Sequence, residues 1–264
     1  MSDLNRLEEQ SVYILREAYA SVSPMVMLWS LGKDSCVMLW LARKAFLGHV
    51  PFRVVHIDTG YEFPEVYQFR DEITEAWNLP LEVYPAAPIE QVDSTLTPGA
   101  RFAARKMQGL MNLVSERELR GVIAGIRRDE QAVRAKERVF SPRDAEGNWD
   151  FRDQPAEMFD QFTTDCPPGS HLRIHPLLAW SERDIWRYIK RETIPVVPLY
   201  FAKNGQRFRS LGEVGITEPI ASQADTVDAI ITELEADKRP ERAGRTFDHE
   251  SEDTFERLRA QGYL

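Results

Sequence analysis

Cysteine is scarce in this sequence, with Cys36 and Cys166 as the two examples among 264 residues. Two distant cysteines outside any CxxC pair exclude a disulfide framework and indicate free thiols in a reducing compartment. Long apolar runs are missing as well, since no stretch reaches the ~18 residues of a membrane-spanning helix. The first residues include neither the basic nor the apolar region of a secretory leader, so we expect a cytoplasmic protein without membrane contact.

The sequence also lacks an excess of positive charge. Its formal net charge is −9 at pH 7. Nucleic acids and anionic membrane surfaces attract proteins through positive fields, so neither is expected as a partner. An anionic substrate therefore requires a local basic pocket. The hydrophobic content of 43% and the length are sufficient for a core that needs no disulfide or metal.

Several motifs of familiar chemistries are missing. The chain contains no GxSxG elbow, no HExxH pair and no calcium-binding EF-hand loop. Cys166, His171 and His175 could supply three zinc ligands at most and have no paired fourth, so no metal site is expected at these residues. On a strand, His171 and His175 would share one face, where a packed or hydrogen-bonded pair is the simpler interpretation. Without a nucleophile and its base, catalysis would depend on positioning and electrostatics.

What the sequence does contain is an alternation of strand-like and helix-like apolar patterns. Strands are predicted at 25–30, 52–58, 81–84, 121–125 and 172–177, and helices at 4–22, 36–46, 64–77, 102–118 and 181–192. Pro64 fits the first turn of its helix, and Ser181 is a typical N-cap residue. Alternating β and α units predict an α/β fold with a doubly wound parallel sheet.

Two segments depart from this alternation. Residues 127–169 are polar and rich in Arg, Asp and Pro, which predicts a long loop layer over the sheet. We divide the chain into an α/β domain, residues 1–200, and a C-terminal helical tail, residues 201–264. The tail should pack on the domain or on a partner, with helical patterns near 226–236 and 250–260.

The clearest chemical motif is a short loop between the first predicted strand and its helix. It reads SLGKDS and begins at Ser30. The start of a helix presents unpaired backbone N–H groups and the positive end of its dipole, which together bind phosphates. Gly32 allows the backbone to approach closely, Lys33 adds a positive charge, and Ser30 and Ser35 add hydroxyl donors.

This loop differs from a Walker motif. It lacks the first glycine of GxxxxGK[ST], and Asp34 stands where that motif has serine or threonine. A switch-type NTPase is therefore disfavoured. The order SxGKDS after a strand resembles the pyrophosphate-binding loop of the adenine-nucleotide α-hydrolase group, whose members hold pyrophosphate while the α-phosphorus is attacked. The alternative is an ordinary solvated turn between strand and helix.

The second predicted strand ends in HIDTG, beside the first strand of a doubly wound sheet. Ligands of open α/β sheets bind at this edge, where backbone groups could hold adenine. Two roles are open for Asp58. It could orient a ribose or Mg²⁺, or it could cap the turn, since aspartate is common in turns.

A basic segment follows the fourth predicted strand, just after Gly125. Five of the 12 residues from 127 to 138 are basic in an otherwise acidic protein. Guanidinium groups offer paired planar donors to phosphate or sulfate oxygens and stabilise an anionic transition state. A solvated loop with internal ion pairs is the alternative. The candidates are Arg127, Arg128, Arg134, Lys136 and Arg138.

Several motifs, in the same order, resemble one family. SLGKDS, HIDTG, GIRRDE, RAKERVFSPRD and the closing ERAGR and RAQGYL are similar to segments of the small catalytic subunit of bacterial ATP sulfurylase, within the adenine-nucleotide α-hydrolase and PAPS reductase-like group. The similarity runs along nearly the whole chain. It implies that residues 1–200 form a nucleotide-binding catalytic domain. It also implies transfer of the adenylyl group of ATP to sulfate, with Mg²⁺, giving adenylyl sulfate and pyrophosphate.

The resemblance also assigns a partner and residues. It implies a complex with a GTP-hydrolysing large subunit. The nucleotide would lie near Asp58 and Gly125, and the basic segment would contact sulfate and the α-phosphate. Two stretches depart from the family pattern, because FAKNGQ before Arg207 is short and no Cys-Trp-Pro follows RFRSLG. The pyrophosphate would be held by Ser30, Gly32, Lys33, Asp34 and Ser35.

Three other functions stay open at this point. A relative could adenylylate a different small acceptor. A reductase of adenylyl sulfate or its 3′-phosphorylated form would need a nucleophilic thiolate, and no cysteine follows Cys166. A nonenzymatic, nucleotide-binding regulatory subunit could keep the same loop.

Overall fold

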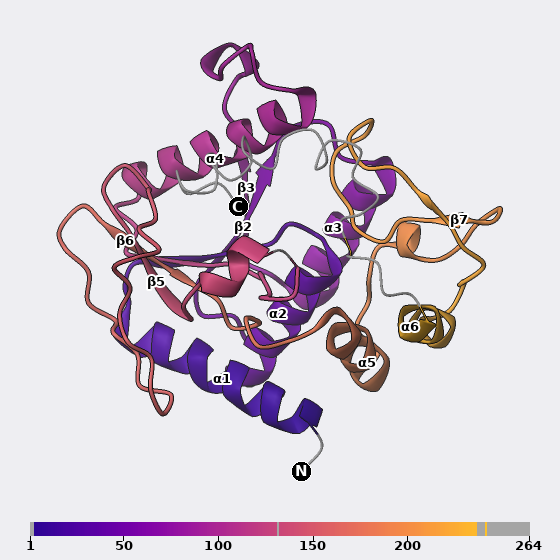
Figure 1. Ribbon diagram of the computed structural model, residues 1–264, viewed down its shortest axis with the longest axis horizontal. Coiled ribbons are helices and arrows are strands. Elements are labelled where there is room, and N and C mark those ends of the chain that lie inside the picture. Colours follow the sequence, from indigo (N-terminus) through magenta and orange to yellow (C-terminus); the bar gives the residue numbers. More distant parts are fainter. Residues whose placement is uncertain (1–2, 131, 237–240, 242–264) are drawn as a thin grey trace.

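A computed structural model describes residues 3–130, 132–236 and 241 of the chain. Its centre, seen in Figure 1, is a sheet, and its six strands have the order β3-β2-β1-β4-β6-β5. Neighbouring strands pair in parallel except for β5 and β6, which are antiparallel. The expected doubly wound α/β sheet is confirmed. The strands are β1 (Met25–Leu28), β2 (Arg53–Asp58), β3 (Leu81–Pro85), β4 (Gly121–Ile123), β5 (Phe140–Arg143) and β6 (His171–Ile174).

Helices cover both faces of the sheet (Figure 1). One face is covered by α1 (Asp3–Ser21), α2 (Lys33–Ala45), α3 (Pro64–Trp77) and α5 (Glu182–Glu192), and the other by α4 (Pro98–Glu116). Alternate residues of β1 therefore belong to different cores. Met25 and Met27 lie in the larger core, whereas Val26 and Leu28 pack with α4.

The strand order reverses next to β1. The chain continues from β1 to β2 and β3 on one side, and α4 then returns it to β4 on the other side. The carboxyl ends of β1 and β4 thus form the switch point of the sheet. Ligands of open α/β sheets bind in the crevice at such a point.

Helix starts follow the sequence closely, with two exceptions, one of which is α4, which begins at Pro98, four residues before its predicted start. α3 begins at Pro64, and Ser181 caps α5 as predicted. α2 begins at Lys33, three residues earlier than the predicted helix, with Gly32 as its N-cap. The charged end of the SLGKDS loop is therefore the first turn of a helix and not a free turn.

The segment 127–169 contains more regular structure than a loop layer. It includes a 3-10 helix, η2 (Ala132–Lys136), and the edge strand β5. Pro142 obscured this strand in the sequence, because proline interrupts a strand pattern. Proline is tolerated at the edge of a sheet, where its missing N–H leaves no central pairing unmade.

The described part of the tail packs on the α/β domain. It contains a small hairpin of β7 (Gln206–Arg207) and β8 (Ile220–Ala221), and α6 (Val227–Ala236), and it follows η3 (Pro198–Tyr200) at the end of the domain. The helix expected at 226–236 is confirmed, and the one at 250–260 lies outside the described residues. α6 lies beside α5 (Figure 1), where Arg187 and Glu235 form an ion pair of 3.1 Å.

One short 3-10 helix, η1 (Ile89–Gln91), precedes α4.

Among the helices that the structure describes, none combines the length and apolar content needed to cross a lipid bilayer.

Candidate active site

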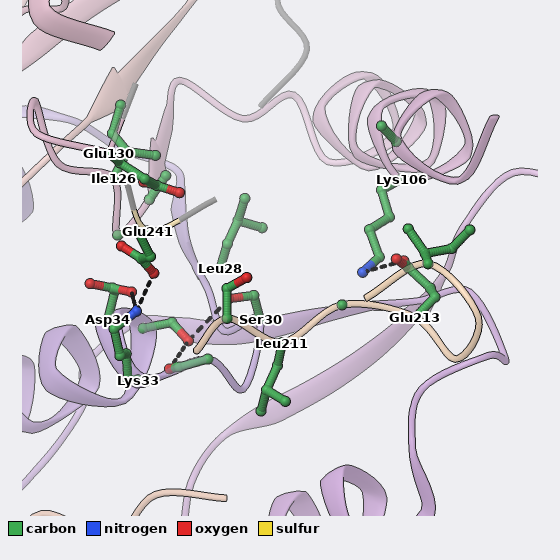
Figure 2. Close-up of a pocket in the computed structure, with 18 of the residues that line it drawn as sticks. Leu28, Ser30, Lys33, Asp34, Lys106, Ile126, Glu130, Leu211, Glu213 and Glu241 are labelled. Atoms are coloured by element: carbon green, nitrogen blue, oxygen red, sulfur yellow. Dashed lines mark hydrogen bonds and ion pairs between the residues drawn. The ribbon is translucent and has the colours of Figure 1, made fainter. Parts of the chain in front are cut away.

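A pocket of about 250 Å³ lies at the switch point between β1 and β4. Its walls come from the SLGKDS loop, from the Ala124–Ile126 stretch after β4, from α4 and from the segment 210–213. Figure 2 shows charged side chains at two ends of this pocket, Lys33 with Asp34 at one and Lys106 with Glu213 at the other. The segments that meet here are far apart in the sequence.

The start of α2 lacks a side-chain cap. Its N-cap, Gly32, has no side chain, and the backbone N–H of Lys33 donates to the Tyr200 hydroxyl over 3.0 Å. Ser35 donates from its hydroxyl to the carbonyl of Gly32 over 2.9 Å, and the Ser30 and Ser35 hydroxyls are 3.2 Å apart. The helix thus presents its positive dipole end to the pocket.

Buried charges surround this helix start. Lys33 is 1% exposed and Arg127 is fully buried. Lys33 Nζ lies 3.3 Å from Asp34, and Arg127 forms ion pairs with Asp34 and with Glu241. Glu241 also pairs with Lys33. Arg127 Nε donates to Asp129 over 2.9 Å, which links the cluster to the loop after β4.

Ion pairing decides the protonation of this cluster. Burial alone would lower the pKa of Arg127, but Glu241 and the neighbouring carboxylates raise it above the usual value. Burial would likewise raise the pKa of Glu241, but Lys33 and Arg127 hold it well below the usual range. We therefore treat Arg127 as a cation and Glu241 as an anion at neutral pH.

Arg134 is the second arginine that the structure brings to the site. It lines the pocket, is 7% exposed and forms an ion pair with Glu130, which also lines the pocket. Of the five basic candidates, Arg127 and Arg134 are thus the two that the structure brings to this edge of the sheet.

Arg127 pairs with Asp34 and Glu241 of the pocket lining without lining the pocket itself, and the other three basic candidates lie away from it. Arg128 is exposed, and its guanidinium donates to the carbonyl of Glu137 over 3.4 Å. Lys136 is exposed, with Nζ 4.5 Å from the centre of the Phe151 ring. Arg138 donates to a backbone carbonyl 17 residues further along the chain. The turns after β4 point neighbouring side chains in different directions, so closeness in sequence did not place these three at the site.

Of the two roles left open for Asp58, the structure shows the second, in which the side chain caps the turn. Asp58 does not line the pocket. Its carboxylate accepts hydrogen bonds from the backbone N–H of Gly60, at 2.7 Å, and from the Tyr67 hydroxyl, at 2.8 Å. Burial acts to raise the pKa of Asp58, but these hydrogen bonds lower it below the ordinary value. The structure therefore gives no support to a contact between Asp58 and a ligand in this pocket.

Close backbone approach occurs at Gly125 and not at Gly32. A Cβ on Gly125 would lie 3.4 Å from the backbone nitrogen of Ser35, so the glycine lets the strand end pack on the first turn of α2. Gly32 has an ordinary φ of −70°, and a Cβ there would meet the Tyr200 hydroxyl at 3.6 Å, a normal contact.

A second charged group closes the opposite end of the pocket. Lys106 Nζ, on α4, lies 3.0 Å from Glu62 and 2.6 Å from Glu213. Burial alone would lower the pKa of Lys106, but these two carboxylates raise it above its usual value. The lysine thereby ties the segment 211–213 to α4 and to the loop before α3.

The sequence alone did not reveal several residues of the site. Tyr200, Lys106 and Glu213 stand in no motif, and Tyr200 is 167 residues from the Lys33 N–H that it accepts. Glu241 carried a weak signal, because it lies in the ERAGR segment that supported the family resemblance. Nothing in that segment indicated a contact with Lys33.

Cys166, His171 and His175 do not form a metal centre in the structure. The described residues include no group of three or more His, Cys, Asp or Glu side chains placed to hold a metal. His171 and His175 are buried, and burial is the main cause that lowers their pKa values to about 3 and about 4. His175 Nδ1 lies 2.8 Å from the backbone carbonyl of Arg138, a hydrogen-bonding distance.

The sequence and the fold correspond to a known class of α/β proteins. Residues 24–219 match the phosphoadenosine phosphosulfate reductase domain family. FMN adenylyltransferase of Candida glabrata in complex with ATP has the same fold, with a TM-score of 0.56 and 22% identity over 83% of this chain and 64% of that one. Yeast FAD synthetase in complex with FAD has a TM-score of 0.53 and 17% identity, over 93% of this chain and 92% of its own.

Relatives of similar length define the protein further. Sulfate adenylyltransferase subunit 2 of Pseudomonas putida is 37% identical over 303 aligned positions, which cover 100% of this chain and 99% of that protein. The subunit 2 of a Marinomonas species is 38% identical over 296 positions, covering 100% and 98%. The chain belongs to the sulfate adenylyltransferase subunit 2 family and is an enzyme subunit.

Proposed function

We propose that this protein transfers the adenylyl group of ATP to sulfate, forming adenylyl sulfate and releasing pyrophosphate. The observation that carries the proposal is the placement of Lys33 and Arg127 at the uncapped start of α2, beside the switch point of the sheet. Such a helix start suits a polyphosphate. The name shared by the full-length relatives supports sulfate as the acceptor.

The leaving pyrophosphate is the group that this site would stabilise. A sulfate oxygen attacks the α-phosphorus, the bond from that phosphorus to the bridging oxygen breaks, and the electron pair stays on pyrophosphate. Lys33, Arg127 and the first turn of α2 would face the charge that develops there. Preorganised cations of this kind lower the barrier when they bind the transition state more strongly than the substrate.

The remainder of ATP would extend along the pocket towards Lys106. Leu28 and Leu211 lie between the two charged ends (Figure 2), and Met107 also lines the pocket. This apolar section suits the flat ring of adenine. We assign Arg134 to sulfate, because it is the basic pocket-lining residue that lies outside the Lys33 cluster and the Lys106 group.

Mg²⁺ would enter this site together with ATP. Enzymes of nucleotides commonly bind Mg²⁺ through one or two carboxylates and the phosphates of the substrate. The carboxylate of Asp34 lines the pocket beside Lys33 and fits such an arrangement. The ion would neutralise charge on the phosphates.

The partner we propose is a GTP-hydrolysing large subunit. The name of the relatives, subunit 2, implies a companion subunit in those proteins. We place the complex in the cytoplasm, in agreement with the two free cysteines.

Pyrophosphate release from ATP tests the proposed function. We expect the purified chain, mixed with a GTPase large subunit and GTP, to release pyrophosphate in a sulfate-dependent way. Phosphate and nitrate serve as control oxyanions, and reactions without an acceptor or without the large subunit complete the series. Release that is independent of sulfate, or that needs a different acceptor, would contradict the assignment.

A further inference from the structure

Glu241 brings a carboxylate into the site from beyond the end of α6. One of its oxygens pairs with Lys33 Nζ and the other with Arg127 Nη2 (Figure 2 shows Glu241 above Lys33). Its side chain is 6% exposed. Lys33 belongs to α2 and Arg127 to the loop after β4, so the carboxylate bridges two separate elements. A phosphate group presents the same feature, several oxygens on one centre, to paired cations.

The charges of this cluster disfavour a bound pyrophosphate while the Glu241 carboxylate is in place. Asp34 and Asp129 each pair with Arg127, and Asp34 also lies beside Lys33. Two carboxylates thus balance two cations before Glu241 is counted, and Glu241 makes the cluster net negative. A pyrophosphate group placed on Lys33 and Arg127 would meet Glu241 at short range, where like charges repel strongly in a buried setting. The carboxylate and the phosphate therefore exclude one another.

We propose that Glu241 is an internal competitor, which occupies the pyrophosphate subsite when it is empty and leaves when ATP or pyrophosphate binds. The proposal rests on the proposed function of the SLGKDS loop. Its physical benefit lies in the empty state, because buried cations that lose a partner are strongly destabilising. A carboxylate that returns to Lys33 and Arg127 also opposes rebinding of the pyrophosphate product.

Competition has a measurable signature. The apparent dissociation constant of a ligand equals its intrinsic constant divided by the fraction of molecules whose site is open. If Glu241 fills the subsite in about nine molecules of ten, its removal should tighten binding about tenfold. A carboxylate that only anchors the chain, or that contacts the ligand favourably, would give unchanged or weaker binding.

Titration calorimetry with inorganic pyrophosphate tests the proposal in the full chain. We expect Glu241→Gln, which removes the charge but keeps the shape, to lower the Kd of pyrophosphate about tenfold. Glu241→Ala should do the same and excludes residual hydrogen bonding by the amide. The matched control is Glu235→Gln, in α6, whose exposed side chain pairs with Arg187, and its Kd should stay within about twofold of the wild-type value.

Thermal melts give a second readout. Without ligand, Glu241→Gln should melt below the wild type, because Lys33 and Arg127 lose a buried partner. Saturating pyrophosphate should raise its melting temperature by more than it raises that of the wild type. An equal or smaller increase, or a Kd that is unchanged or raised in both Glu241 variants, overturns the proposal.

Lys33→Ala separates this proposal from the proposed function. If the SLGKDS loop holds pyrophosphate, Lys33→Ala should raise the Kd more than tenfold. Unchanged binding in Lys33→Ala removes the loop from the site altogether. Weaker binding in Lys33→Ala with no gain in Glu241→Gln keeps the pyrophosphate site and rejects Glu241 as its competitor.

Discussion

The helices α2 and α5 both begin beside the same cluster of charges, but their first turns are completed in different ways. In α5, Ser181 accepts a hydrogen bond from the Asp184 backbone, and Asp184 accepts one from Ser181. Asp129 also accepts from the backbone N–H of Glu182, at 2.9 Å. In α2, the N-cap is Gly32, which supplies no side-chain acceptor.

This difference separates a structural helix start from one that can bind a ligand. At the start of α5, the backbone N–H groups of Glu182 and Asp184 donate to Asp129 and Ser181, so an anion gains little there. At the start of α2, the Lys33 backbone N–H donates to the Tyr200 hydroxyl, and the helix start faces a pocket with two buried cations beside it. α3 and α4 also begin without a side-chain cap, so the feature that distinguishes α2 is the pocket with two buried cations at its start.

The largest effect is expected at Arg127, which forms an ion pair with Asp34 in the first turn of α2. Arg127→Ala should lower kcat and kcat/KM together by roughly two to three powers of ten, because a preorganised donor is lost. It should also destabilise the fold by about 3–5 kcal/mol, since the buried carboxylate of Glu241 loses a partner. Arg127→Lys should recover little, because an ammonium cannot reproduce the planar paired donors. Steady-state kinetics and urea unfolding measure both effects.

Arg128 is the matched control for that experiment. Its side chain is exposed and donates to a backbone carbonyl, so Arg128→Ala should keep kcat within about twofold and cost less than about 1 kcal/mol. The sequence alone treated both arginines alike. Equal losses of turnover in the two variants would mean that the charge at α2 is not what drives catalysis.

A smaller effect is expected at the start of α5. Ser181→Ala removes the cap and should lower the free energy of unfolding by about 1 kcal/mol, while kcat changes by less than about twofold. Ser181→Thr keeps a hydroxyl cap and should retain most of the stability. Chemical denaturation and turnover are measured side by side. A tenfold loss of turnover in folded Ser181→Ala would show that α5 also contributes to the site.

The smallest effect is expected for the cysteines. Burial raises the pKa of Cys36, in the first turn of α2, to about 12, so its thiol is neutral at pH 7. Adenylyl transfer by direct displacement needs no thiolate, whereas a reductase does. Cys36→Ser and Cys166→Ser should therefore keep kcat within about twofold. Loss of turnover in folded Cys166→Ser would favour a thiol-dependent reaction instead.

Much of the fold could be predicted because its signals are local. Strand and helix patterns alternate over short distances, and Pro64 and Ser181 mark helix starts by their own conformational preferences. The loop at Lys33 was predictable for the same reason, since strand, glycine and charged residues follow one another directly. The edge strand β5 was not predicted, because Pro142 interrupts the residue pattern on which strand prediction depends.

The rest of the site could not be predicted because it depends on side-chain direction and on long-range contacts. Arg128 and Arg127 are adjacent in sequence, yet one is exposed and the other is buried against Asp34. Asp58 ends a strand at the expected edge, but its hydrogen bonds to Gly60 and Tyr67 hold it in the turn. Such outcomes follow from the packed structure and leave no local pattern.

The pairing of β1 with β4 also has a consequence for how the protein folds. Val26 pairs with Val122, although two complete β–α units separate them along the chain. Closing so long a loop is slow, because its entropy is lost before the strand contacts compensate. The units up to β3 can assemble from contacts between neighbours, whereas the pocket needs β4 and the segment 210–213 as well. We expect nucleotide binding to appear late in refolding, which makes it a direct reporter of completed folding.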